Sequence, residues 1–322
     1  MSSPTARRAG LLLLALGALV LMACLNAGGA SPPEPTATPT TPPSPTATSA
    51  PPTPTPPPRR GIEFDPPQIV QGGVAVVYLN EPASSATLRF NERQYPMLNQ
   101  DGRWWAIVGV GAWEAPGLHA VAITYTPSGK STTASIVQSI LVVDREFSVE
   151  RIDLDDKTAS LLSQEVVQAE LARRAAIYSG FTSQRYWSGA LQAPGKGSIS
   201  SRFGEGRSYN GAPVSDYHRG TDFIGDIGSP VSAAGAGRVV FAAALSVRGN
   251  SVIVDHGAGV FTAYHHLSEI RVAEGRLVGV GEQIGAIGST GLATGPHLHW
   301  EVVVRGVEVD GELWLTGGAV GP

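Results

Sequence analysis

The sequence predicts an all-β protein in which two β domains are joined by a short helical connector. Short runs rich in β-branched and aromatic residues alternate with turn residues from Gly61 to about Asp144, as is typical of antiparallel strands. Short valine- and glycine-rich strands return from about Ser198 to Leu315, with little helical periodicity. The predicted boundaries are 1–23 for a signal peptide, 24–60 for a linker, 61–146 for an immunoglobulin-like β-sandwich, 147–197 for the connector and 198–316 for the second β domain.

Composition limits the partners and the means of stabilisation. The 322 residues leave room for one or two domains with apolar cores. A formal net charge of -4 and a pI of about 6.0, without a long Lys/Arg run, argue against nucleic acid as a partner. Cys24 is the only cysteine, so an intramolecular disulfide is excluded.

The first residues have the pattern of an export signal. Arg7 and Arg8 precede the apolar run Leu11 to Met22, which is too short for a comfortable membrane span and ends in small residues. Its end, Leu21 to Cys24, resembles the lipobox of bacterial lipoproteins, in which the cysteine is lipidated and becomes the first mature residue. This resemblance implies an exported protein, lipid-anchored through Cys24 at the cell envelope. The alternatives are an ordinary signal peptide with an incidental cysteine and, from the paired arginines, export in the folded state.

The segment from Ser31 to about Arg60 is nearly all Pro, Thr, Ser and Ala, a composition that favours extended, polyproline-like chain. At about 3.1 Å per residue, roughly thirty residues reach at most on the order of 90 Å. Such a tether would hold a folded domain well clear of a membrane.

The first β domain shows several strands of similar spacing, which indicates an antiparallel sandwich of immunoglobulin-like type. Its three neighbouring tryptophans, Trp104, Trp105 and Trp113, are interpreted as core residues, with a sugar- or peptide-binding platform as the alternative. No catalytic constellation is evident there. The predicted strands are Val74 to Leu79, Ala86 to Phe90, Trp104 to Val110, Leu118 to Tyr125 and Ser135 to Val143.

Residues Asp155 to Tyr178 change to a helical period, and a helix is expected to start near Ser163. Val167, Leu171, Ala175 and Tyr178 form its apolar stripe, and the Arg173-Arg174 pair is expected on a solvated face. The helix is therefore predicted to pack between the two β domains.

Two short motifs in the second β domain carry candidate metal ligands. His218 and Asp222, four residues apart, supply a neutral nitrogen and an anionic oxygen, a set that zinc accepts. Leu298 to Val304 is predicted to form a strand, whose period of two places His297 and His299 on one face. Glu301 falls on the same face, where it would either hydrogen-bond a ligand and orient it or be an exposed carboxylate at a strand end.

The remaining histidines have weaker signals. Along the predicted strand around Tyr264, His266 shares the face of Tyr264 and His265 takes the opposite face, so only one of the two is expected to reach the site. His256, at a predicted hairpin turn, is interpreted as structural, and His119 as a satisfied polar residue.

From about Ile199 to Leu315 the chain closely resembles the lysostaphin/LytM-type zinc endopeptidases, which cut the peptides of bacterial peptidoglycan. The segments that carry the resemblance follow in order: Ser201-Arg202-Phe203-Gly204, the glycine- and valine-spaced strand from Gly228 to Val239, Gly249-Asn250, Val252 to Gly257, Tyr264 to Ser268, Ile284 to Gly291 and Thr294 to His299. The resemblance implies the β-sheet peptidase fold of that family, the duplicated hybrid motif.

The resemblance also implies the roles of the site residues. His218, Asp222 and His299 would bind one zinc ion and leave a position open for water. His297 would act as general base and His266 would hydrogen-bond the oxyanion, although these two roles are exchangeable. Asn210, with Tyr209, lies where some relatives carry a loop that covers the zinc, so it is a candidate for blocking the site.

Two positions depart from the family's pattern. His265 stands where a small residue is usual, and Gly311 follows Asp310 where proline is common. The first would alter the rim of the groove and the second only the end of the chain.

Three functions are compatible with these features. The first is an active zinc endopeptidase acting on stem peptides or cross-bridges in cell-wall remodelling. The second is a noncatalytic peptidoglycan-binding regulator of another hydrolase. Noncatalytic members of the same fold characteristically lose metal ligands, which this chain retains. The third is a wall-anchoring lipoprotein that binds through its sandwich. The sequence specifies neither the bond cleaved nor an activator protein.

Overall fold

The computed structural model describes residues 60–154 and 162–317. The predicted signal peptide, Cys24 and nearly all of the linker lie outside the described residues, as does the start of the predicted helical segment, 155–161. The chain divides into two units, Met1–Pro56 and Pro57–Pro322, and every described residue belongs to the second. Within the described part, no helix has the length and apolar character needed to cross a membrane.

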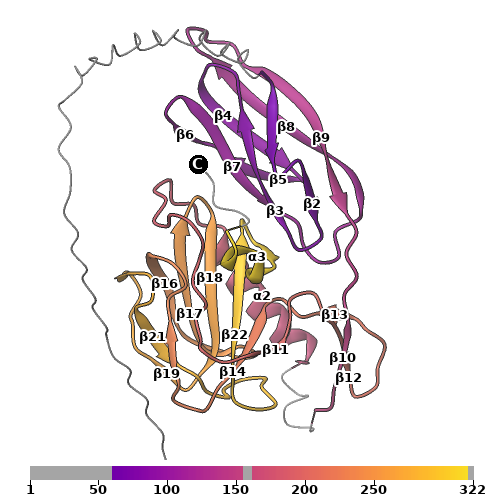
Figure 1. The fold of residues 1–322 in the computed structure, drawn as a ribbon, viewed down its shortest axis with the longest axis vertical. Helices are drawn as coiled ribbons and strands as arrows, with labels where there is room; N and C mark the ends of the chain where they lie inside the picture. Colours follow the sequence, from indigo (N-terminus) through magenta and orange to yellow (C-terminus); the bar gives the residue numbers. More distant parts are fainter. Residues whose placement is uncertain (1–59, 155–161, 318–322) are drawn as a thin grey trace, which may run out of the picture. The chain divides into compact units, whose positions relative to one another are not determined.

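A β-sandwich forms the first half of this unit (Figure 1). One sheet has the strand order β1-β3-β7-β6 and the other β2-β9-β8-β4-β5. All five predicted strands are present. The structure adds four strands of three or four residues, which are too short to show alternation in the sequence. The strands are β1 (Ile62–Asp65), β2 (Gln68–Val70), β3 (Val74–Leu79), β4 (Ala83–Phe90), β5 (Arg93–Pro96), β6 (Leu98–Gln100), β7 (Arg103–Gly109), β8 (Gly117–Pro127) and β9 (Ala134–Val143).

Alternation of apolar residues along these strands gives the sandwich its core. Val77, Leu88, Val108 and Val121 are fully buried in one cluster between the two sheets. A sandwich is therefore confirmed, whereas its assignment to the immunoglobulin-like type stays a prediction.

The three tryptophans of the sandwich differ in their surroundings. Trp105 is buried, and half-buried Trp104 donates its indole N–H to the Ala83 carbonyl, so both fit the core interpretation. Trp113 is 53% exposed and its ring lies 5.0 Å from the ring of Tyr217, so the core interpretation is wrong for this residue.

The connector contributes one strand and one helix. β10 (Val149–Ile152) pairs in parallel with β12 (Gly206–Tyr209) of the second domain. Helix α2 (Gln164–Tyr178) begins directly after Ser163, as predicted, but its buried residues are Glu170, Arg174 and Tyr178. The expectation of a solvated Arg173-Arg174 pair is correct for Arg173 and wrong for Arg174, because a buried carboxylate, Glu301, lies against the Arg174 guanidinium.

The second half is again all-β. Its main sheet has the order β11-β14-β22-β18-β17-β16-β20, with β23 pairing β22, and the small sheet β15-β21-β19 accompanies it. The short helix α3 (Gly311–Leu315) follows, capped by the Asp310 side chain, which accepts a hydrogen bond from Glu312 N–H. The strands are β11 (Ile199–Ser201), β12 (Gly206–Tyr209), β13 (Asp216–Tyr217), β14 (Thr221–Ile224), β15 (Pro230–Ser232), β16 (Gly237–Leu245), β17 (Gly249–Gly257), β18 (Val260–Leu267), β19 (Glu269–Ile270), β20 (Leu277–Val278), β21 (Gln283–Ala286), β22 (His297–Val304) and β23 (Val307–Val309).

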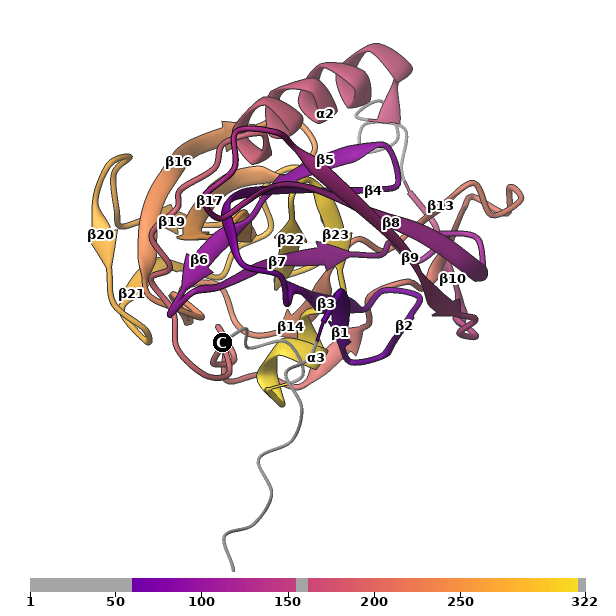
Figure 2. The same cartoon turned by 90° about the horizontal axis from the view of Figure 1, so that it is seen from above.

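The core of this second half continues into the sandwich. Trp300 and Val302 of β22 belong to the same buried cluster as Trp105 and Ile107 of β7. Strand β7 lies against β22 and β23, as the view in Figure 2 also shows. A Cβ at Gly109 would lie 2.9 Å from Val309 Cγ1, so the close approach of the two strands requires glycine there. The strand that carries the site histidines is thus supported from behind by the first β domain.

This shared core predicts that Trp105→Ala lowers the free energy of unfolding by roughly 3–5 kcal/mol. The substitution removes an indole that is 2% exposed and leaves a cavity behind β22. Chemical denaturation followed by circular dichroism measures the change, with exposed Trp113→Ala as the control. A loss no larger than that of the control would contradict a core shared by the two halves.

Candidate metal centre

Two adjacent strands place the candidate ligands next to one another. Asp222 of β14 and His299 of β22 are direct cross-strand partners, and His218 precedes β14 by three residues. Gly220 makes this approach possible, since a Cβ there would lie 2.3 Å from the Trp300 carbonyl oxygen and 3.0 Å from His299 Nε2. The segment His-Arg-Gly-Thr-Asp therefore packs directly against β22, the strand that carries His297 and His299.

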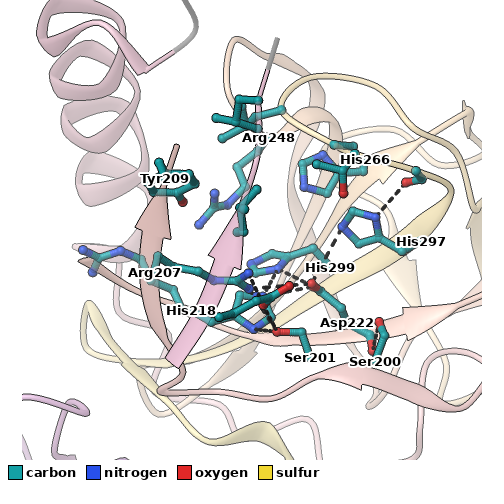
Figure 3. A pocket seen from close by; sticks show the side chains of 18 of the residues that line it. Ser200, Ser201, Arg207, Tyr209, His218, Asp222, Arg248, His266, His297 and His299 are labelled. Atoms are coloured by element: carbon teal, nitrogen blue, oxygen red, sulfur yellow. Dashed lines mark hydrogen bonds and ion pairs between the residues drawn. The ribbon is translucent and has the colours of Figure 1, made fainter. Parts of the chain in front are cut away.

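The donor atoms of these three residues converge (Figure 3). His218 Nε2 lies 3.0 Å from Asp222 Oδ1 and 2.8 Å from His299 Nδ1, and His299 Nδ1 lies 2.7 Å from the same carboxylate oxygen. All three side chains are buried, and their ligand atoms lie within 4.8 Å of one another. Two imidazole nitrogens and one carboxylate oxygen directed at one point are the donor set of a catalytic zinc site, which keeps a fourth position open.

Electrostatics favour the forms of His218 and Asp222 that bind a metal. Burial lowers the pKa of His218 to about 4, although the neighbouring Asp222 carboxylate acts in the opposite sense. Burial by itself would raise the pKa of Asp222, but His218 and His299 outweigh this effect and hold the pKa well below its usual value. At neutral pH, His218 is thus neutral and Asp222 is ionised, as zinc ligands must be.

Hydrogen bonds on the far side of His218 fix its orientation. Its Nδ1 donates to the Arg202 carbonyl oxygen at 2.9 Å and lies 3.1 Å from Ser201 Oγ. This leaves the Nε2 lone pair for the metal.

His299 is oriented by Glu301 in the same way. His299 Nε2 donates to Glu301 Oε1 at 3.0 Å, so that Nδ1 faces His218 and Asp222. Glu301 is 0% exposed and also accepts hydrogen bonds from Arg174 and Arg248. Burial would raise its pKa, but the two arginines hold the pKa well below its ordinary value. The alternative of an exposed carboxylate at a strand end is therefore wrong.

His297 and His266 lie beside the converging ligands (Figure 3). The centroids of their imidazole rings are 4.8 Å apart. Nδ1 of His297 donates to the Gly295 carbonyl oxygen, and Nδ1 of His266 donates to that of Thr290. In both rings this leaves Nε2 with a free lone pair. Nε2 of His297 lies 3.9 Å from Asp222 Oδ2, at the edge of the metal site.

The predicted alternation of side chains between the two faces of β18 fails at His266, near the end of the strand. Tyr264 is fully buried in the core beside Trp300, and His265 is the cross-strand partner of His299, with their rings 5.7 Å apart. His266 adopts a left-handed conformation with φ +61°, which breaks the period of two. Both histidines lie near the site: His266 stands beside His297, while fully buried His265, paired with His299, contacts Ser251 and lies 3.7 Å from Glu301.

The structural interpretations of the last two histidines are confirmed. His256 is fully buried and bonds the Ala236 carbonyl and Thr262 Oγ1. His119 hydrogen-bonds Asn91 Oδ1 and the Ala115 carbonyl oxygen. It belongs to the sandwich half of the fold and is far in sequence from the other histidines.

Asn210 does not cover the metal site. Its side-chain oxygen accepts a hydrogen bond from Leu154 N–H at 2.7 Å, and its backbone has φ +49°. Tyr209, and not Asn210, lines the cavity over the ligands. The prediction that Asn210 blocks the site is therefore wrong in this structure, because the side chain closes a turn against the connector instead.

A cavity of about 340 Å³ opens over the three ligands. Its walls include Glu150 of β10, Arg207 and Tyr209 of β12, and Arg248. Arg207 is buried, donates to the Glu150 carboxylate and to Ser201 Oγ, and places Nη2 3.9 Å from Asp222 Oδ2. No local pattern in the sequence indicates Arg207 or Arg248, since each is an isolated arginine outside any motif and only the tertiary fold brings it to the site.

Comparison with known proteins assigns this region to a family. The model of peptidase family M23 matches residues 216–311, which include all three converging ligands and both neighbouring histidines. Residues 216–311 form a peptidase family M23 domain. The model of the peptidase family M23 N-terminal domain matches residues 67–137, which lie in the sandwich.

Relatives of the M23 domain agree with this assignment. The peptidoglycan DD-endopeptidase ShyA of Vibrio cholerae is 47% identical over 93 residues, 29% of this chain and 22% of that protein. The DD-carboxypeptidase/endopeptidase Mpg of Neisseria meningitidis is 44% identical over 93 residues, 29% of this chain and 21% of that protein. The chain thus matches about a fifth of the length of these relatives.

A solved structure extends the likeness beyond the M23 domain. A crystal structure described as a peptidase M23 from Pseudomonas aeruginosa superimposes with a TM-score of 0.60 at 28% identity. The superposition covers 77% of this chain and 95% of the Pseudomonas aeruginosa chain. At this coverage the similarity includes parts of the chain outside residues 216–311.

The close approach at Gly220 predicts that Gly220→Ala weakens zinc binding by about tenfold or more. The added methyl group would overlap the Trp300 carbonyl and push β22 away, which would displace His299. Competition with a chelator measures the affinity. Gly195→Ala is the matched control, because its nearest neighbours would lie 3.6–3.8 Å from the new Cβ. Unchanged zinc affinity in a folded Gly220→Ala protein would contradict the geometry of the site.

Proposed function

We propose that this chain is a zinc-dependent endopeptidase that hydrolyses peptide bonds in peptidoglycan. The observation that carries the proposal is the convergence of His218, Asp222 and His299 beneath an open cavity, with two further imidazoles beside them. The M23 match and the peptidoglycan endopeptidases among the relatives support it. His218, Asp222 and His299 are the proposed ligands of one zinc ion.

Zinc bound there would polarise the scissile carbonyl and lower the pKa of a water molecule in the fourth position. Side chains of the protein then accept and donate the protons. His297 Nε2 has a free lone pair at the edge of the site and accepts the proton of the attacking water. The same nitrogen can afterwards deliver that proton to the departing amine.

His266 is the proposed partner for the developing oxyanion. That role requires a proton on Nε2, because Nδ1 already donates to the Thr290 carbonyl. Burial disfavours this protonated form, since it lowers the pKa of His266 well below its usual value. Exchange of the two roles is therefore the alternative that single variants of His297 and His266 would distinguish.

We infer that the bond cleaved is a D,D-peptide bond of a direct cross-link. The support is the printed activity of the relatives, which are DD-endopeptidases or a DD-carboxypeptidase/endopeptidase. A peptide would reach the ligands past Gly295 and Pro296, which line the cavity beside His297. A bond in an interpeptide cross-bridge is the alternative substrate.

A noncatalytic regulator is less well supported. Such a protein has no need for ligands of matched geometry or for a cavity that leads to them, and this chain keeps both. The role of the sandwich in wall binding and the existence of an activator protein stay predictions.

His299→Ala should lose both bound zinc and activity, whereas His297→Ala should keep zinc while turnover falls by about 10² or more. The first variant removes a ligand and the second removes the base. Zinc content and the amine termini released from purified peptidoglycan are measured on the same samples, and His256→Ala serves as a buried histidine outside the site. Full zinc occupancy in His299→Ala would remove that residue from the ligand set, and near-normal turnover in His297→Ala would transfer the role of base to His266.

We also propose that the protein is exported and anchored in a membrane by a lipid on Cys24. The support is the Leu-Met-Ala-Cys sequence that ends the apolar run, followed by a Pro/Thr-rich tether. Cys24→Ser should leave peptidoglycan cleavage intact and move the protein from the membrane fraction to the soluble one. Fractionation with labelled fatty acid tests this, and continued membrane association without label would contradict the anchor.

A further inference from the structure

Helix α2 reaches the metal centre although it lies outside the matched M23 segment. Its Arg174 side chain is 4% exposed, and Nη2 donates a hydrogen bond to Glu301 Oε2. The same nitrogen lies 3.5 Å from Glu308 Oε1. A cation on a connector helix is thus buried against the carboxylate that orients a proposed zinc ligand.

The contacts form a short chain from the helix to the ligand atoms. Glu301 Oε1 accepts from His299 Nε2, and the other nitrogen of that ring, Nδ1, lies 2.8 Å from His218 Nε2. Arg248 binds Oε1 as well, at 3.0 and 3.1 Å. Arg174 is therefore the arginine that hydrogen-bonds Oε2, an oxygen that also lies 3.7 Å from His265 Nε2. Without Arg174, this oxygen would lose the hydrogen bond from a guanidinium.

The side chains of Arg174 and Arg248 differ in their exposure to solvent. Arg248 lines the cavity and its side chain is 17% exposed, so it is partly open to solvent. Arg174 is enclosed and is part of a regular helix. Because a buried carboxylate has a fixed orientation only when both oxygens are satisfied, Arg174 is needed in addition to Arg248.

A second contact ties the same helix to the same network. Glu170, one turn before Arg174, accepts hydrogen bonds from the backbone N–H groups of Val247 at 2.6 Å and Arg248 at 3.2 Å. Both buried charges of α2 therefore act on Glu301, Arg174 directly and Glu170 through the backbone of Arg248. This explains why positions of the helix that face the protein carry charges where apolar residues are expected.

We propose that Arg174 is a positioning residue for the metal centre: through Glu301 it holds the His299 ring with Nδ1 directed at the zinc. Helix α2 then belongs to the metal-binding unit, and a fragment limited to residues 216–311 lacks part of it. The proposal rests on the zinc centre put forward above.

The test compares Arg174→Met with Arg173→Met in the full chain. Met keeps apolar volume but removes the hydrogen bonds and charge. Arg173 is the matched control, since it is exposed and lies over the Phe241 ring at 4.8 Å. Zinc affinity is measured by chelator competition, and cobalt absorption spectra report the ligand geometry independently of activity. Circular dichroism of each metal-free variant establishes that it is folded.

We expect Arg174→Met to weaken zinc binding by about 10- to 100-fold and to change the cobalt spectrum, with Arg173→Met unchanged. Arg174→Lys, which restores the charge without the planar fork, should recover part of the affinity. Wild-type affinity and an unaltered spectrum in folded Arg174→Met would overturn the inference. If Arg174→Met does not fold, Arg174→Lys decides, and full wild-type affinity and spectrum there would overturn it.

Different results would contradict the zinc centre and the role of Arg174. If the wild-type protein binds zinc and cleaves peptidoglycan while Arg174→Met binds zinc equally well, only the role of Arg174 is wrong. If the wild-type protein binds no zinc, both the zinc centre and the role of Arg174 are wrong.

Discussion

The carboxylate of Glu301 is the point on which the site depends. It is fully buried, and it receives one hydrogen bond from His299 and others from Arg174 and Arg248. An uncompensated charge at such depth would be strongly destabilising, so the arginines are a requirement of the fold. Once they are present, the ring of His299 is fixed and its Nδ1 faces His218 and Asp222. The ligand geometry thus follows from the placement of one buried anion.

That requirement links parts of the chain that are far apart in sequence. Arg174 comes from the connector helix, and Glu150 and Arg207 come from the wall formed by β10 and β12. The proposed ligands come from β22, from β14 and, for His218, from the segment just before β14. Behind β22, Trp300 packs in one cluster with Trp105 of the sandwich. The M23 domain therefore has its site completed by the connector and its core completed by the first β domain.

Local patterns in the sequence predicted much of this. The period of two along β22 correctly placed His297, His299 and Glu301 on one face, and the five longer strands of the sandwich were evident from alternation. The prediction failed where a single backbone angle decides, since the positive φ of His266 interrupts the alternation and His266 lies near the site together with His265, the cross-strand partner of His299. It also failed at Arg174, whose burial depends on a carboxylate 127 residues away, which no local pattern reveals.

The zinc centre is best tested by anomalous diffraction at the zinc edge, on crystals of protein purified without added metal. We expect one zinc peak per chain, about 2.0–2.2 Å from His218 Nε2, His299 Nδ1 and a carboxylate oxygen of Asp222. We also expect that His299 Nε2 remains hydrogen-bonded to Glu301. Absence of zinc, a peak at other residues, or coordination through His299 Nε2 would contradict it.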